Sequence, residues 1–198
     1  RSAAKAFEQV AMDSGIQTRV AVTAEADEII LAERIVLPGV GAFADCLSGL
    51  DSLPGVREAL HEVVIKAGRP FLGICVGMQL MARSSHENGT HQGLGWITGE
   101  VVALPRGHVK VPHMGWNELV IRAKHPVLEG IEDRKDFYFV HSYHLRSEDE
   151  SEILANTEYG GSICALVGRD NMVGTQFHPE KSQAAGLKFI SNFLSWRP

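Results

Sequence analysis

Short apolar runs alternate along this chain with segments in which apolar residues recur every three or four positions. The runs at 19–22, 34–37 and 71–74 predict buried strands. Helical spacing of apolar residues predicts helices over 2–14, 43–50, 56–64 and 182–196. Strands that alternate with helices at this spacing favour an α/β fold, with a mostly parallel sheet and helices on both faces.

The middle of the chain, from about 93 to 163, has a different pattern. It carries β-type segments at 96–104 and 136–141, turn residues and few helical periods. Residues 162–169 and 171–177 then read as a hairpin. We therefore expect an antiparallel excursion at the sheet edge, within a single domain that spans residues 1–198.

One cysteine stands where an apolar strand pattern changes into a helical pattern. Cys75 follows the run 71–74 directly, with Gly73 and Gly77 two positions on either side. Glycines at these positions permit the sharp strand-to-helix turn of a nucleophile elbow, and a helix N-terminus favours the thiolate. An isolated cysteine is more often buried and inert. The flanking glycines favour a nucleophile here.

A second motif supplies a candidate base. His178 and Glu180 are two residues apart at the junction of the last predicted strand and the last helix, so in an extended chain they point the same way. The pattern predicts a triad in which Cys75 attacks, His178 transfers the proton and Glu180 orients His178. Without the elbow, this short motif would be read as a surface histidine beside a helix start.

Backbone groups near the elbow are candidates for an oxyanion hole. The glycines of Pro38-Gly39-Val40-Gly41 let the N–H groups of Gly39 and Val40 turn toward an oxyanion, and the Val76 N–H is the second candidate donor. The alternative is a plain glycine-rich turn. Gln79 lies four residues after Cys75, on the same face of the predicted helix, so we expect its amide to reach a bound substrate.

Composition and charge narrow the class of protein. The 198 residues are 44% hydrophobic and 22% charged, with a net charge of −5 and no basic block, which argues against nucleic acid and anionic membranes as partners. No apolar run approaches the ~20 residues of a membrane span. With no signal-peptide pattern and only three cysteines, none in a CxxC pair, we expect a reduced, cytoplasmic protein. Cys46 and Cys164 read as core residues.

The nine histidines suggest a metal site, but the pattern does not support one. His108 with His113, and His141 with His144, are spaced loosely enough to ligate a metal, yet no carboxylate or cysteine completes either set. We therefore predict no metal and no cofactor.

Five motifs occur together and in order along nearly the whole chain: PGVGAF (38–43), GICVGMQLM (73–81), VPHMGWN (111–117), FYFVHSYH (137–144) and TQFHPEKS (175–182). With these motifs the chain resembles the class I, triad-type glutamine amidotransferases, which have a flavodoxin-like fold. More narrowly, it resembles the glutaminase subunits of imidazole glycerol phosphate synthase, from histidine biosynthesis. The last three motifs carry the narrower resemblance.

The resemblance implies hydrolysis of L-glutamine to L-glutamate and ammonia through a thioester on Cys75. The ammonia would pass to a (β/α)8-barrel cyclase subunit in a heterodimer. Gly41, Gln79, Ser142 and Tyr143 would contact the substrate, and the partner interface would include Trp116, Tyr138 and Lys181. A PGVG segment that rotates an amide into the oxyanion hole would keep the subunit nearly silent until the partner's site is occupied.

The sequence departs from the family at its start. Family members open with a strand and a D-Y-G-x-G-N-type loop before the helix that begins at Arg1 here, so we expect the first family strand to be missing. Three alternatives remain open. They are a glutaminase of another ammonia-channelling synthase, an α/β-hydrolase or Cys peptidase that uses the same elbow, and a catalytically silent fragment that acts as a binding partner.

Overall fold

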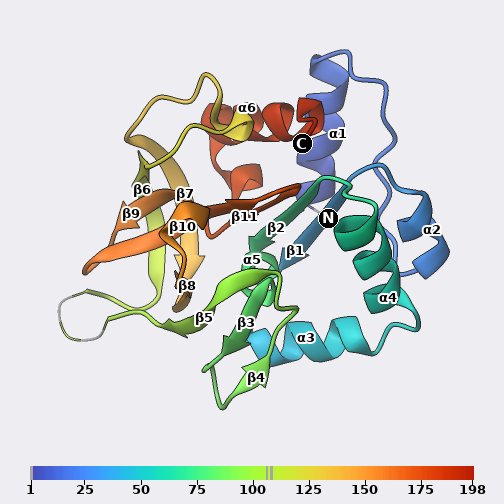
Figure 1. The fold of residues 1–198 in the computed structure, drawn as a ribbon. Helices are drawn as coiled ribbons and strands as arrows, with labels where there is room; N and C mark the ends of the chain where they lie inside the picture. Colours follow the sequence, from blue (N-terminus) through green and yellow to red (C-terminus); the bar gives the residue numbers. More distant parts are fainter. Residues whose placement is uncertain (1, 106, 108) are drawn as a thin grey trace.

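The structure, a computed structural model, describes residues 2–105, 107 and 109–198. Its largest element is a seven-stranded sheet with the order β1-β2-β11-β10-β9-β6-β7. The bounds of these strands are β1 Ile35–Gly39, β2 Phe71–Cys75, β11 Met172–Thr175, β10 Ser162–Arg169, β9 Ile153–Glu158, β6 His113–Ile121 and β7 Lys135–His141. Strand β2 lies between β1 and β11, so its carboxyl end is flanked by two other strands (Figure 1).

Parallel pairing is confined to one side of this sheet. Strands β1 and β11 both pair parallel to β2, and the register places Gly39 opposite Cys75. From β11 onward, every neighbouring pair is antiparallel, including the predicted β10–β11 hairpin. The predicted α/β fold and its antiparallel excursion are therefore confirmed, with the excursion forming the far side of the sheet.

Helices cover the sheet from two sides. Helices α1 (Ser2–Asp13) and α6 (Gln183–Ser195) lie side by side above the strands in Figure 1, while α3 (Phe43–Asp51) lies below them. The short α5 (Val76–Leu80) begins directly after β2. The other helical segments are α2 (Ala26–Leu31), α4 (Val56–Leu60), the π-helical η1 (His61–Lys66) and the 3₁₀ turns η2 (Pro126–Leu128), η3 (Glu150–Glu152) and η4 (Pro179–Lys181). None of the described helices has the length and apolar character needed to cross a membrane.

The core lies between the sheet and these helices. Phe177 packs its ring against Phe137 and Phe189, with centroids 4.4 Å and 5.5 Å away, and all three side chains are fully buried. Phe7 of α1 meets Phe193 of α6 edge to face at 6.2 Å. Aromatic contacts of this kind stabilise the core beyond simple burial. The contacts of Phe177 and Phe189 hold the chain before and after residue 178.

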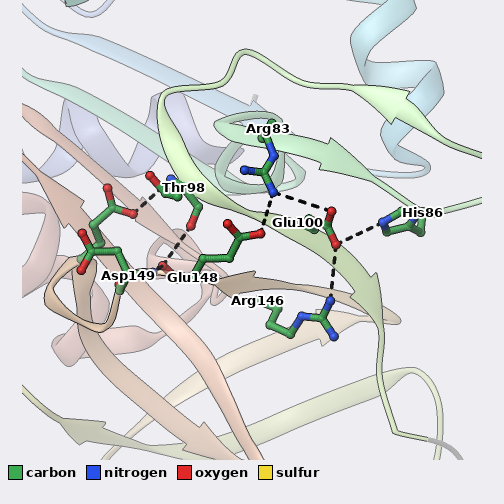
Figure 2. A network of polar contacts seen from close by, with 9 residues as sticks. Arg83, His86, Thr98, Glu100, Arg146, Glu148 and Asp149 are labelled. Carbon is green, nitrogen blue, oxygen red and sulfur yellow. Dashed lines mark hydrogen bonds and ion pairs between the residues drawn. The ribbon is translucent and has the colours of Figure 1, made fainter.

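A second, smaller sheet has the order β4-β3-β5-β8, with bounds β4 His91–Gln92, β3 Ala82–Ser85, β5 Ile97–Ala103 and β8 Tyr143–Ser147. Figure 2 shows the polar network on its surface. Glu100 of β5 faces Arg83 at 3.8 Å, and His86 and Arg146 at 3.3 Å each. Because the three partners of Glu100 are about half exposed or more, the pairs contribute little to stability individually, but they join β3, β5 and β8.

One predicted strand is wrong. Residues 19–22 form no strand, and Val22 is 78% exposed. A strand is stable only when its backbone groups pair with a neighbour. Among the described residues no strand pairs with 19–22, so the apolar pattern there forms extended chain that packs only in part, through Val20.

Candidate active site

The sharp turn after β2 depends on its glycines. Cys75 adopts φ 56° and ψ −111°, which is rare for a residue with a side chain. A Cβ at Gly73 would lie 2.6 Å from the Gly77 carbonyl oxygen, and a Cβ at Gly77 would collide with the Leu37 carbonyl oxygen of β1. The glycines thus let α5 approach both strands, and the turn directs the cysteine side chain out of the sheet.

The Cys75 thiol is almost fully enclosed. Its sulfur lies 3.7 Å from the Val140 carbonyl oxygen and 3.7 Å from Nε2 of Gln176. Burial raises the pKa of the thiol to about 12, although the Val76 N–H acts in the opposite direction. The expectation that the helix terminus favours the thiolate is therefore not met at rest, because desolvation outweighs the dipole of a five-residue helix. The thiol needs a base.

His178 carries such a base. Its Nδ1 lies 2.9 Å from Oε1 of Glu180, so Nδ1–H donates to the carboxylate. Its Nε2 is buried and has no hydrogen-bond partner among the described residues. Burial acts most strongly, to raise the pKa of Glu180, but the hydrogen bond and charge of His178, the Glu180 backbone N–H and the Lys181 charge together lower the net pKa. The neutral imidazole held in this way carries its proton on Nδ1 and offers Nε2 as the acceptor.

A loop contact holds this histidine. Ser182 Oγ donates to the His178 carbonyl oxygen at 2.6 Å and accepts the Tyr138 N–H at 3.0 Å. The residue predicted to start the last helix thus ties the loop after β11 to strand β7. Its oxygen makes no capping bond to α6.

Cys75 and His178 line one cavity of about 320 Å³, within the range of small-molecule sites. The structure brings most of the sequence-predicted residues to its wall: Val40, Gly41, Cys75, Val76, Gln79, Ser142, Tyr143, His178 and Lys181. Gly39 does not line the cavity, but it pairs with Cys75 across the strands. Val40 is 73% exposed, at the open side.

Gln79 is differently engaged from what we expected. Its Nε2 donates to the Tyr143 carbonyl oxygen at 2.9 Å and to Oε1 of Gln176 at 3.1 Å, so both amide hydrogens are used within the protein. Gln176 was missed by sequence reasoning. The signal was present two residues before His178, on the same face of an extended chain as the histidine.

Glu87 is a second residue that sequence reasoning missed. Its Oε2 accepts the Phe43 N–H at the start of α3 at 2.7 Å, and the residue also lines the cavity. The carboxylate gives the cavity a negative group that suits an ammonium. No motif around position 87 indicated this, because only the fold brings the residue to the cavity that Cys75 lines.

The three predicted interface residues form one cluster, which we call the aromatic cluster. Trp116 and Tyr138 are paired across β6 and β7, with ring centroids 5.9 Å apart. The Lys181 ammonium lies 5.8 Å from the Tyr138 ring centroid. Trp116 is 48% exposed, and Lys181 reaches the cavity wall. The cluster therefore extends from the surface to the cavity.

The histidines considered for metal binding are engaged with protein groups. His113 Nδ1 and His141 Nε2 lie 3.0 Å apart, and His144 Nδ1 donates to the Leu145 carbonyl oxygen at 3.1 Å. His108 lies outside the described residues. Within the described part of the chain, no group of three or more His, Cys, Asp or Glu side chains is arranged to hold a metal.

Comparison with known proteins places this chain in a family. The family "Glutamine amidotransferase class-I" matches residues 2–195. The chain belongs to the class-I glutamine amidotransferases. It is therefore a glutamine amidotransferase, and the elbow and cavity described above are features of that enzyme.

Relatives of this amidotransferase match it over its full length. It is 53% identical to imidazole glycerol phosphate synthase subunit HisH of Brucella melitensis over 203 residues, covering 100% of this chain and 94% of the relative. It is 55% identical to the subunit of the same name from Rhodospirillum rubrum over 201 residues, with the same coverage.

Solved structures agree on the fold. A crystal structure titled glutamine amidotransferase has a TM-score of 0.71 at 16% identity, covering 97% of this chain and 94% of the other. The glutaminase domain of Trypanosoma brucei CTPS, solved with bound acivicin, has a TM-score of 0.67 at 16% identity and covers 100% of this chain and 88% of that one.

Proposed function

We propose that this amidotransferase is the cytoplasmic glutaminase subunit of an imidazole glycerol phosphate synthase, with residues 1–198 acting as one domain. Relatives that carry this name at 53% and 55% identity over the full chain support the assignment. The motifs VPHMGWN and FYFVHSYH support it further. The observation that carries the chemistry is the shared cavity of Cys75 and His178, with Glu180 hydrogen-bonded to the histidine.

The reaction begins with proton transfer from the thiol. His178 Nε2 takes the Cys75 proton as the sulfur attacks the side-chain amide carbon of glutamine, and the amide oxygen becomes an oxyanion. His178 then gives the proton to the leaving nitrogen, and ammonia departs. Water, activated by His178, cleaves the thioester to release glutamate and restore the thiol. Glu180 stabilises the imidazolium formed in each half-reaction.

Groups around the thiol serve binding and charge stabilisation. The Val76 N–H, together with a backbone N–H of Gly39 or Val40, donates to the oxyanion. The Glu87 carboxylate accepts the α-ammonium group of glutamine, and the backbone of Gly41, Ser142 and Tyr143 holds the rest of the substrate. This distribution suits an amino acid whose side-chain amide must reach Cys75.

Ammonia is delivered to a cyclase subunit. The aromatic cluster supports a docking site, because it combines an exposed tryptophan with a lysine at the cavity wall. Aromatic and cationic side chains of this kind are enriched in protein interfaces. A cyclase seated there would receive ammonia directly from the cavity.

The test is glutamate release from glutamine, measured with and without the cyclase subunit and its nucleotide ligand. We expect strong activity only in the loaded complex. Activity that depends on a different synthase partner would reassign the acceptor. Cleavage of esters or peptides without glutamine turnover would indicate a hydrolase instead.

Removal of the nucleophile separates glutamine hydrolysis from the reaction of the cyclase subunit. Cys75→Ala should lower glutamine hydrolysis by about 10⁴-fold or more, because no thioester can form. The complex should still make product from added ammonium, since the cyclase is unchanged. Glutamine hydrolysis at the parent rate would refute the role of Cys75.

A further inference from the structure

A buried hydrogen-bond network converges on one main-chain oxygen, the Tyr143 carbonyl. This oxygen accepts Nδ1–H of His141 at 2.9 Å and Nε2–H of Gln79 at 2.9 Å. It belongs to the cavity wall formed by residues 140–143, which also supplies the Val140 oxygen beside the Cys75 sulfur. Two donors from different elements thus hold one peptide group of the wall.

The Tyr143 carbonyl determines which ring nitrogens of His141 and His113 carry a proton. A carbonyl oxygen only accepts, so His141 must carry its proton on Nδ1, which leaves Nε2 as an acceptor. His113 Nδ1, 3.0 Å away, must then be the donor. His113 Nε2 in turn accepts from Nδ2 of Asn117 at 3.2 Å. Because His113 Nε2 accepts, this ring carries its proton on Nδ1 and donates to His141 Nε2, so both rings are neutral and in the Nδ1–H form.

The same carbonyl orients the side chains of Gln79 and, through it, Gln176. Gln79 Nε2 spends one hydrogen on Tyr143 and the other on Oε1 of Gln176, 3.1 Å away. That contact turns Nε2 of Gln176 toward the Cys75 sulfur, 3.7 Å away. A continuous chain of hydrogen bonds thus runs from Asn117 on β6 to the sulfur.

Packing holds the outer ring of this chain. His113 stacks between Tyr159, with a centroid distance of 3.8 Å, and Phe139, at 4.8 Å. Both histidines are buried, with exposures of 3% for His113 and 6% for His141. Burial disfavours the charged form and lowers the pKa of His113 to about 4 and that of His141 to about 3. The neutral state that the geometry requires is therefore maintained near neutral pH.

We propose that His113 and His141 are positioning residues for glutamine binding, which act by holding the Tyr143 carbonyl and the cavity wall through this directional network. The proposal rests on the glutaminase function, in which residues 142 and 143 contact the substrate. His113 does not line the cavity, whereas His141 does, but both ring nitrogens of His141 are engaged with Tyr143 and His113. Their hydrogen bonds act on the substrate through the wall, so they act on KM more than on kcat.

Two substitutions at position 141 distinguish the network from simple packing. In His141→Asn, the amide nitrogen takes the place of Nδ1 and keeps the bond to Tyr143. In His141→Gln, the amide lies near the place of Nε2 and keeps only the contact with His113. The network predicts that KM for glutamine rises about tenfold in His141→Gln and less than about threefold in His141→Asn. Packing predicts the reverse order, because asparagine leaves the larger cavity.

The experiment measures kcat and KM in the activated complex for both variants, with His144→Asn as a matched control. His144 is buried, bonds the Leu145 carbonyl oxygen and lies outside the network, so its substitution should leave KM unchanged. A larger KM effect in His141→Asn than in His141→Gln would overturn the proposal. A fall in kcat with KM unchanged would also overturn it, because that result means only that a smaller fraction of the enzyme is active.

A second readout needs no activity. NMR of isotope-labelled ring nitrogens at about neutral pH should show both His113 and His141 with a protonated Nδ1 and an unprotonated Nε2. Either ring found with its proton on Nε2 would overturn the network. A parent complex without glutamine hydrolysis would instead refute the glutaminase function, so the two failures are distinguishable.

Discussion

Cys75 combines two unfavourable conditions at one residue. Its backbone lies at φ 56° and ψ −111°, and its thiol is buried with a pKa raised to about 12. Strained backbone and a protonated nucleophile both cost free energy in the resting state. Under the proposed function, both would keep the enzyme inactive until substrate and partner reorganise the site. The strain can be measured separately from the chemistry.

Cys75→Gly should be more stable than Cys75→Ala by about 1 kcal/mol, because glycine adopts this backbone conformation without strain. Both variants lack the thiol, so their difference reports the backbone. Denaturant unfolding of each protein measures it. In the control Ala184→Gly, at an exposed position of α6, glycine should instead cost about 1 kcal/mol. An Ala variant at position 75 as stable as the Gly variant would show that the turn is relaxed.

The buried histidines make folding stability depend on pH. The pKa values of His113 and His141 fall from 6.5 to about 4 and about 3 on folding. Below about pH 6.5 the unfolded chain binds protons that the folded protein refuses, so stability falls as the pH drops. Between its folded and its unfolded pKa, each histidine changes the free energy of unfolding by about 1.4 kcal/mol per pH unit.

His141→Asn should therefore have a stability curve that is flatter by about 1.4 kcal/mol per pH unit between about pH 6 and pH 4. Denaturant unfolding of parent and variant across this range measures both slopes, and the carboxylates that titrate there are common to both proteins. Equal slopes would mean that His141 binds its proton in the folded state as readily as in the unfolded state.

At the scale of elements, the site depends on how closely α5 approaches β1 and β2. Gly77 has no room for a side chain, because its Cβ would meet the Leu37 carbonyl oxygen. The contact also places the Val76 N–H beside the end of β1, where Gly39 faces Cys75. The positions of the proposed oxyanion donors are therefore set by the distance between α5 and β1.

Gly77→Ala should destabilise the protein by about 3 kcal/mol and remove glutamine hydrolysis, since the helix must move away from β1. Gly49→Ala is the matched control: this glycine lies within α3, and a Cβ there would meet nothing within 4 Å. The control should gain about 0.5–1 kcal/mol. Unfolding in denaturant gives both values. A small loss of stability in Gly77→Ala would mean that α5 can move away from β1 at little cost.

Local patterns were enough to predict the elements that build the site. The glycines around Cys75 indicated the turn, and apolar spacing predicted α1, α3, α6 and the β10–β11 hairpin, which the structure confirms. The false strand at 19–22 came from the same kind of pattern, because local sequence does not say whether a pairing partner exists. Strand formation is a property of two segments, whereas helix periodicity belongs to one.

Residues joined across the fold were beyond such patterns. Glu87 reaches the cavity only because β3 returns beside α5, and His113 meets His141 only through the β6–β7 register. Gln79 lay on the anticipated face of its helix, but its partners Tyr143 and Gln176 are 64 and 97 residues away in the chain. Periodicity places a side chain on a face, while hydrogen-bond partners follow from topology.

For the whole molecule, the antiparallel side of the sheet connects a surface to the cavity. Strands β6 and β7 carry Trp116 and Tyr138 of the aromatic cluster, and the same strand pair carries His113 and His141 of the hydrogen-bond network. Met114, 63% exposed, extends the apolar area beside Trp116. Docking of a cyclase on this face would therefore act on the strands that support the substrate-binding wall.

Trp116→Ala should weaken binding of the cyclase subunit about 30-fold, because an exposed tryptophan at an interface centre commonly contributes about 2 kcal/mol. Calorimetric titration of the two subunits measures the change. Leu31→Ala is the control. Leu31 is 81% exposed on α2, at the opposite end of the molecule from β6 and β7 in Figure 1. This variant should bind the cyclase as tightly as the parent does. Because Trp116 is half-buried and packs on Tyr138, its loss should also lower the free energy of unfolding by about 1 kcal/mol, so the titration is run where both proteins are fully folded. Unchanged affinity in Trp116→Ala would exclude the aromatic cluster from the interface centre and require another route from the cavity to the cyclase.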